Sequence, residues 1–273
     1  MIFPVLNHAI PGGGHRVSPR EPSEAPELSW VTGRDYFGSA YATAEWTIGN
    51  TPYDAGPSPA AGYAPSVGTE KLVDNGSGGL TGQTHTDIIT GAGTFTAWEA
   101  VDTGDRLEAS GATAGDFNAL TTDAAGRMEF KFPASVPNSE YIFTKFNTSD
   151  GGWRVYTVSG EWIVGLWDNS GNTDGVQANA PASGTYADGE AHYLSWFWDS
   201  STKTMYTKGD LSTEASAVLS AIVDSTETSA TLNVNGYAGS TGLAGLECLG
   251  VSVCVGAAAR DHYDEIFWNH PPS

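Results

Sequence analysis

The sequence has few cysteines, and their spacing argues against a disulfide bond. The chain of 273 residues holds two, Cys248 and Cys254, both in the run LECLGVSVCVG. If this run is one strand, the two side chains point to the same face roughly 20 Å apart, whereas a disulfide needs Cα atoms within about 7 Å of each other. We therefore expect two buried thiols in a core strand of a protein made in a reducing compartment.

Basic residues are also scarce. Lysine and arginine together number 12 against 32 acidic residues, which gives a formal net charge of −20. Such a charge repels phosphate backbones and anionic lipid surfaces, so neither nucleic acid nor membrane insertion is expected. Solubility or salty surroundings explain the charge most simply, and a dedicated cation-binding surface is the alternative.

Long apolar runs are missing as well. No segment approaches the roughly 18 consecutive apolar residues that cross a bilayer. Pro4, Asn7, His8 and Pro11 interrupt the one N-terminal stretch that could serve as a secretion signal. We expect a soluble protein with no visible secretion signal.

Turn-forming residues, by contrast, are plentiful. The chain holds 34 glycines and 14 prolines, and only 16% of its residues are charged. From about Thr90 onward, runs of aromatic and β-branched residues alternate with turn sequences such as NTSDGG, DNSGNTDG and ADGE. The candidate strands are GRMEFKFP, SEYIFTKFN, GGWRVYTVSG, EWIVGLWD, HYLSWFWD, KTMYTKGD, ATLNVNGY, LECLGVSVCVG and YDEIFWN. This pattern predicts an all-β fold, an antiparallel two-sheet sandwich, with one short helix at residues 213–225.

The same pattern divides the chain into three parts. Residues 1–29 carry five prolines and a glycine triplet, which predicts an extended N-terminal arm. Residues 30–89 combine short candidate strands with Pro/Gly-rich connections. Residues 90–273 form the predicted sandwich, and the length fits one large β domain with an extension.

One strand, HYLSWFWD, is apolar on both faces. His192, Leu194, Trp196 and Trp198 share one face by the two-residue period, and Tyr193, Ser195 and Phe197 take the other. A strand of this kind is covered on both sides, so we expect its rings to form the wall of the core rather than an exposed sugar platform. A histidine in such a place is more often a hydrogen-bonded structural residue than a catalytic base.

The stretch around this strand resembles a known family. The run DGEAHYLSWFWDSSTKTMYTKGD is similar to the central hairpin of laminin-G-like domains, which belong to the concanavalin A-like superfamily. Asp188, Gly189 and His192 match the family's D-G-x-W-H pattern, while Ala191 replaces its tryptophan and Lys208 departs from its Asp-Gly. The ending from Tyr263 resembles the family's closing strand, with Asp264, Glu265 and Ile266 aligned.

The resemblance covers roughly residues 90–273 and implies a concanavalin A-like jelly roll. Retaining glucanases of this superfamily carry paired carboxylates as E-x-D-x-E, a pattern that this sequence lacks. The nearest acidic cluster, Asp261, Asp264 and Glu265, has the wrong spacing for that chemistry. The lack of these carboxylates favours a non-enzymatic protein, and a glycoside hydrolase or lyase with an atypical site is the alternative.

Two kinds of binding site are candidates. Trp153, Trp162 and Trp167 are the rings that we expect to stack on sugar faces if the chain binds carbohydrate. The loop DNSGNTDG offers side-chain oxygens from Asp168, Asn172 and Asp174 at alternating positions, as calcium loops do, and laminin-G-like domains often hold one Ca²⁺ at the rim. A plain polar turn is the alternative interpretation of this loop.

Taken together, these features favour a non-enzymatic virion structural protein: a bacteriophage capsid decoration, head fibre or tail component that displays a lectin-like sandwich. In this hypothesis the arm at residues 1–29 binds other virion proteins, and the protein is a homo-oligomer within the virion, after synthesis in the host cytoplasm. A carbohydrate-binding module is the alternative, and the two roles are compatible, because a virion knob can hold host-surface glycan.

Overall fold

The computed structural model describes residues 44–47, 53–54, 62–63, 72–74, 83–86, 94–109, 122–135, 140–149, 151–179, 185–210, 212–223, 230–237 and 240–264. Nearly all regular structure in these ranges is β-strand, accompanied by one short helix, α1 (Ala259–Asp264). Within this part of the chain, no helix is long and apolar enough to cross a membrane. Residues 1–29, where we expect the arm, lie outside these ranges.

Eight strands form one antiparallel sheet, which we call sheet A. Its order is β15-β14-β13-β8-β17-β6-β5, and β1 also pairs with β17, beyond the residues that pair with β6. The strands are β1 (Ala44–Thr47), β5 (Gln83–Thr86), β6 (Thr94–Glu99), β8 (Ala124–Lys131), β13 (Ala191–Asp199), β14 (Thr204–Gly209), β15 (Ala215–Val218) and β17 (Glu247–Val255).

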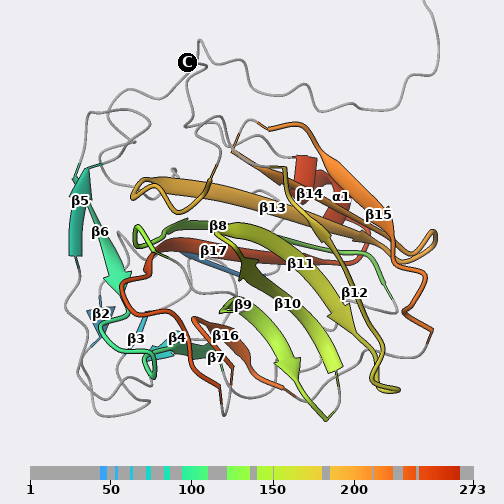
Figure 1. The fold of residues 1–273 in the computed structure, drawn as a ribbon, viewed down its shortest axis with the longest axis horizontal. Helices are drawn as coiled ribbons and strands as arrows, with labels where there is room; N and C mark the ends of the chain where they lie inside the picture. The colour runs from blue at the N-terminus through green and yellow to red at the C-terminus, as the bar shows by residue number, and fades with distance from the viewer. Residues whose placement is uncertain are drawn as a thin grey trace, which may run out of the picture.

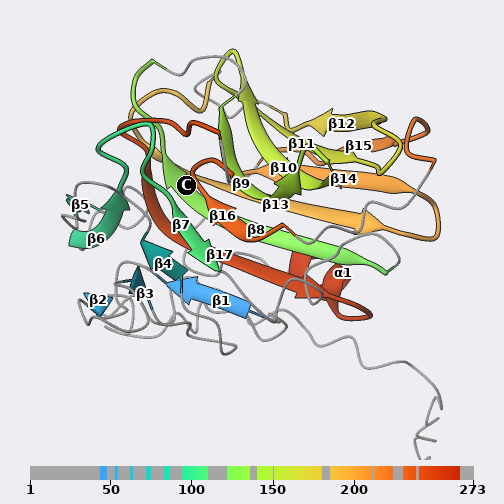
Figure 2. The ribbon, with the colours of Figure 1, turned by 90° about the horizontal axis from the view of Figure 1, so that it is seen from below.

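Nine strands form the second sheet, sheet B, in the order β12-β11-β10-β9-β16-β7-β4-β3-β2. They are β2 (Tyr53–Asp54), β3 (Gly62–Tyr63), β4 (Leu72–Asp74), β7 (Leu107–Ala109), β9 (Tyr141–Asn147), β10 (Gly151–Val158), β11 (Glu161–Trp167), β12 (Thr173–Gln177) and β16 (Leu232–Val234). The two sheets lie face to face (Figures 1 and 2), and one large apolar cluster fills the space between them. The predicted all-β two-sheet sandwich is thus confirmed, and strands from residues 30–89 take part in both sheets.

Strand β13 shows how the sequence builds this arrangement. Leu194, Trp196 and Trp198 enter the cluster between the sheets, whereas Phe197 joins a second cluster on the outer face of sheet A. Helix α1 covers this outer face, where its Tyr263 ring packs on Phe197 with the ring centroids 6.0 Å apart. The prediction that both faces of HYLSWFWD are covered is therefore confirmed.

The two thiols do not share a face, so that expectation is wrong. Strand β17 carries a β-bulge, because Cys248 pairs with Phe130 while Gly250 pairs with Glu129, which leaves Leu249 as an extra residue. The bulge shifts the two-residue alternation by one position. Cys248 consequently faces the core and Cys254 the outer cluster, and both are buried thiols outside any disulfide, as expected.

The helix predicted at residues 213–225 is also wrong, because β15 occupies part of that segment. Ala215 and Ala217 pack against the core while Ser216 and Val218 are exposed, which is the alternation of a strand. The segment hydrogen-bonds along the free edge of β14. Pairing with an available edge overrides the weak helical spacing of the sequence.

The closing strand that the resemblance suggested does not begin at Tyr263. Tyr263 and Asp264 end helix α1, and the residues that follow lie outside the described ranges. An ion pair between Arg260 and Asp264, 2.7 Å apart at positions i and i+4, supports the helix. The apolar outer face of β13 and β8 gives the helix a surface to cover.

Glycine is required at one position of the core. Gly126 lies opposite Trp196, and a Cβ atom at Gly126 would come within 2.4 Å of the indole Nε1. We expect Gly126→Ala to lower the free energy of unfolding by about 1–3 kcal/mol, because the ring must leave its preferred rotamer. Denaturant titration measures this change.

Gly104→Ala is the matched control. No atom lies within 4 Å of a Cβ built at Gly104, so we expect a change of at most about 0.5 kcal/mol. Equal midpoints for the two variants would contradict the packing described for Trp196.

Candidate functional site

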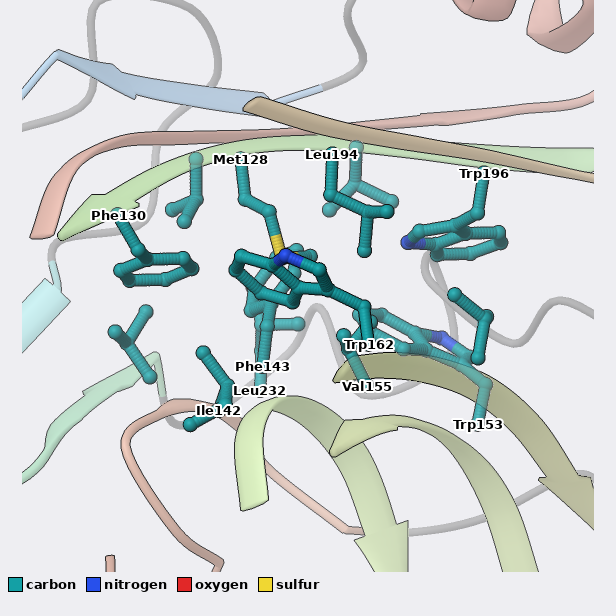
Figure 3. Close-up of a cluster of buried hydrophobic side chains, with 14 of the residues drawn as sticks. Met128, Phe130, Ile142, Phe143, Trp153, Val155, Trp162, Leu194, Trp196 and Leu232 are labelled. Carbon is teal, nitrogen blue, oxygen red and sulfur yellow. The ribbon is translucent and has the colours of Figure 1, made fainter. Parts of the chain in front are cut away.

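The three tryptophans proposed for sugar stacking do not lie together. Trp153 and Trp162 are fully buried between the sheets (Figure 3), and the Trp153 ring packs on Trp196 with the centroids 4.9 Å apart. A ring without accessible surface cannot stack on a sugar, so the prediction is wrong for these two residues. Trp167 is half-buried, and it projects from the opposite face of sheet B.

Trp167 belongs to a group of aromatic rings on that outer face, which we call the Arg154 cluster. The Arg154 guanidinium carbon lies 4.8–5.7 Å from the centroids of four rings, and a fifth ring, Tyr237, closes the group by edge-to-face contacts with Tyr141 and Phe146. Phe146 is buried beneath the others, which are half-buried. The members are Tyr141, Phe146, Arg154, Tyr156, Trp167 and Tyr237.

Strand register brings these side chains to one face. On β10, Trp153 and Val155 point into the core, so Arg154 and Tyr156 point outward. Arg154 lies between Thr144 of β9 and Gly165 of β11, and Trp167 is two residues beyond Gly165. The Tyr156 ring lies against β11 at Gly165, which has no side chain. A Cβ atom at Gly165 would meet this ring at 3.4 Å.

A β-bulge adds Tyr141 to the cluster. Val155 pairs with Phe143, but Tyr156 pairs with Tyr141, so that Ile142 is an extra residue whose side chain stays in the core. Without the bulge, the alternation of β9 would direct Tyr141 between the sheets. In the observed register, its hydroxyl accepts a hydrogen bond from Arg154 Nη1 at 3.2 Å.

Among the described residues Arg154 has no carboxylate partner, whereas three other cations each have one. Arg106, Lys131 and Arg260 each pair with an acidic group at 2.6–3.3 Å. Among the residues that the structure describes, Arg154 contacts the Tyr141 hydroxyl and the aromatic rings, and its buried Nε has no hydrogen-bond acceptor there. Within this part of a strongly acidic chain, the cluster therefore presents a positive charge without an acidic partner.

The phenols of the cluster are hydrogen-bond donors at neutral pH. Burial raises the pKa of Tyr156, and the neighbouring Tyr141 adds to this while the Arg154 charge opposes it. Burial likewise raises the pKa of Tyr237. Half-buried rings with protonated hydroxyls and a central guanidinium can bind a ligand that offers both an apolar face and acceptor oxygens.

The loop proposed for calcium is held by its own hydrogen bonds. Asp168 is buried, its Oδ1 accepts from the backbone N–H of Ser170 and Asn172, and its Oδ2 accepts from the N–H of Val223. The amide of Asn172 also donates to Asp168, and Asp174 accepts from Gly175 and Ala221. N–H donors directed at a carboxylate do not suit a cation, and the described residues contain no cluster of three or more His, Cys, Asp or Glu side chains able to hold a metal. Calcium binding at Asp168, Asn172 and Asp174 stays a prediction.

His192 is clamped between two carboxylates. Its Nδ1 lies 2.7 Å from Asp210 and its Nε2 lies 2.8 Å from Asp188, so Asp188 and His192, which match the pattern of the resemblance, form one hydrogen-bonded unit with Asp210. Burial lowers the pKa of His192, but hydrogen bonds and negative charges from Asp210 and Asp188 outweigh it and raise the pKa above its ordinary value. Asp210 also accepts from the backbone N–H of Tyr193, which ties the turn to β13. The contacts indicate a structural role.

Carboxylates suited to glycoside hydrolysis are not paired in the described part of the chain. Burial raises the pKa of Glu140 and of Glu161. Glu161 pairs with Val158 on the outer face of sheet B, whereas Glu140 lies beside the core-facing Thr157, so the two belong to opposite faces. Asp264 is engaged with Arg260, and Glu265 lies outside the described ranges.

Comparison with known proteins gives a fold but no family. No protein-family model matches the chain, and no curated protein matches it. Among solved structures, it is similar to the botulinum neurotoxin serotype D ligand binding domain in complex with N-acetylneuraminic acid, at 10% identity and a TM-score of 0.57, over 87% of this chain and 55% of that one.

Two further solved structures have a similar fold. They are the serotype D binding domain (9% identity, TM-score 0.55, 87% of this chain and 56% of that one) and the serotype C1 binding domain (9%, 0.54, 84% and 52%). The chain spans about half the length of these structures. The likeness shows the fold alone, a lectin-like two-sheet β-sandwich.

The His192 clamp gives a pH-dependent contribution to stability. Because the pKa is raised in the folded protein, the stabilisation is fully present below the unfolded pKa of about 6.5 and is lost as the pH rises through the folded value. We expect the difference in unfolding free energy between wild type and His192→Gln to be largest near pH 5.5 and to shrink toward pH 9. Urea titrations of both proteins across this range test the expectation, and a difference that stays constant or grows with pH would contradict it.

Proposed function

We propose that this chain is a non-enzymatic carbohydrate-binding β-sandwich and that the Arg154 cluster is its sugar site. The observation that carries the proposal is the gathering of three half-buried rings around one guanidinium on an outer sheet face, with the half-buried Tyr237 ring beside them. Rings that only served the core would lie between the sheets, as Trp153 and Trp162 do.

The chemistry of the cluster suits a sugar. The electron-rich faces of Trp167 and Tyr156 attract the weakly positive C–H groups on one side of a pyranose ring, in the manner of other quadrupole contacts. The hydroxyls of Tyr141, Tyr156 and Tyr237 and the guanidinium offer hydrogen bonds to its oxygens. An apolar surface with a few directed polar groups is the usual composition of a small-ligand site.

Two further observations support a binding role without catalysis. One of the solved structures with a similar fold is a ligand binding domain in complex with N-acetylneuraminic acid, at 10% identity to this chain. In addition, the two glutamates with raised pKa lie on opposite faces of sheet B, so neither can assist the other across one glycosidic bond.

The virion role stays a prediction alongside this proposal. It depends on the arm at residues 1–29, which lies outside the described residues. The two functions are compatible, because a virion protein can also bind host-surface glycan.

A glycan array with the purified protein tests the proposal. We expect wild type to be retained by a subset of glycans, and Trp167→Ala or Tyr156→Ala to weaken binding roughly tenfold or more, as truncation of a central aromatic contact does elsewhere. Tyr206→Ala is the matched control, since Tyr206 is a half-buried ring on the outer face of the other sheet. A blank array for folded wild type, or equal losses for all three variants, would refute the proposal.

A further inference from the structure

The Arg154 cluster also indicates which class of sugar it receives. We infer that Arg154 binds a carboxylate on the sugar, so that the ligands are acidic glycans bearing sialic or uronic acid; this inference rests on the function proposed above. The chain holds 32 acidic residues against 12 basic ones, yet Arg154 has no acidic partner among the described residues.

A second arginine of the chain shows what a structural aromatic cage looks like here. The Arg260 guanidinium also lies over three rings, Phe197, Tyr206 and Tyr263, at 5.1–5.2 Å from their centroids. It is neutralised twice, by Asp264 at 2.7 Å and by Glu214 at 3.7 Å. Arg154 has the same aromatic surroundings but no such neutralisation among the described residues.

The donors that remain on Arg154 are at its edge. Rings surround the guanidinium, and Nη1 already donates to Tyr141. Nε is buried without an acceptor, so the amino group of Nη2 and the second N–H of Nη1 are left for an acceptor from outside the chain. The Tyr141 hydroxyl, having accepted from Arg154, keeps its own O–H to donate. Guanidinium and phenol together form a fork of donors, which matches the two oxygens of a carboxylate.

The net charge of the chain favours a sugar with a single negative charge over a polyanion. A net charge of −20 repels a polyanion such as a sulfated polysaccharide or a nucleic acid over a long range. A ligand with one carboxylate is repelled far less than a polyanion. Its carboxylate also forms a charge-assisted hydrogen-bonded pair with Arg154, which the surrounding rings shield from water. The rings then accept the apolar face of the same sugar, which a free inorganic anion does not have.

Calorimetry with matched ligands tests the inference on the unmodified protein. The probes are sialyllactose, its methyl ester, lactose, and a disaccharide ending in glucuronic acid with its own methyl ester. We expect wild type to bind at least one acid roughly tenfold or more tightly than the corresponding ester, because the ester cannot accept the charge-assisted pair. The acid with the larger discrimination identifies the source of the carboxylate. If neither acid is preferred over its ester, the inference is overturned.

Variants then assign the effect to one residue. Arg154→Gln should bind acid and ester with similar affinity, whereas Arg260→Gln should keep the discrimination of wild type. Persistent discrimination in Arg154→Gln would overturn the inference. If neutral glycans bind through Trp167 as well as acidic ones do, the inference of an acidic ligand is refuted and the proposed sugar-binding function stands. If no glycan binds at all, both the inference and the proposed function are refuted.

Discussion

The packing of large rings between the two sheets constrains everything outside them. The indole of Trp153 lies against that of Trp196 across the sandwich, and Trp162 packs on Phe132 with the ring centroids 4.6 Å apart. Removing one such ring costs about 3–5 kcal/mol in a typical core. A one-residue slip of β10 or β11 would turn Trp153 or Trp162 out to solvent together with its neighbours on that face, so the register of both strands is firmly held.

The register of β10 and β11 also determines which side chains lie on the outer face of sheet B. Once Trp153 and Val155 are committed to the core, Arg154 and Tyr156 have no other direction available. Burial of Trp162 in the same way sends Trp167, five residues later, to the opposite side. The Arg154 cluster thus rests on a rigid support, and this suits a binding site, because side chains held by a packed sheet lose little further entropy when a ligand arrives.

The sequence predicts which face each side chain takes in strands where side chains alternate regularly between the two faces. It does not predict this where a β-bulge breaks the alternation. The two faces of HYLSWFWD could be assigned because all of its residues obey the two-residue period. The same two-residue period places Trp162 and Trp167 on opposite faces of their strand, so the sequence spacing alone could have predicted that only one of them is in the core. The bulges at Ile142 and Leu249 have no such signal, since the partner strand creates the extra residue. Cys248 and Cys254 are therefore misassigned, and the place of Tyr141 beside Arg154 goes unnoticed.

The sequence could not show that Arg154 has no carboxylate beside it among the described residues, because some ion pairs of this chain join distant segments. Lys131 meets Glu247, 116 residues away, while many acidic residues of the loops are engaged by backbone N–H groups instead. Asp105, Asp168 and Asp199 each accept two or more such bonds and hold turns in shape. Turn-capping of this kind engages part of the acidic surplus in hydrogen bonds to the backbone. The composition of the chain consequently says little about metal, and the proposed function rests on the Arg154 guanidinium, which sheet B presents among aromatic rings with no acidic neighbour in the described part of the chain.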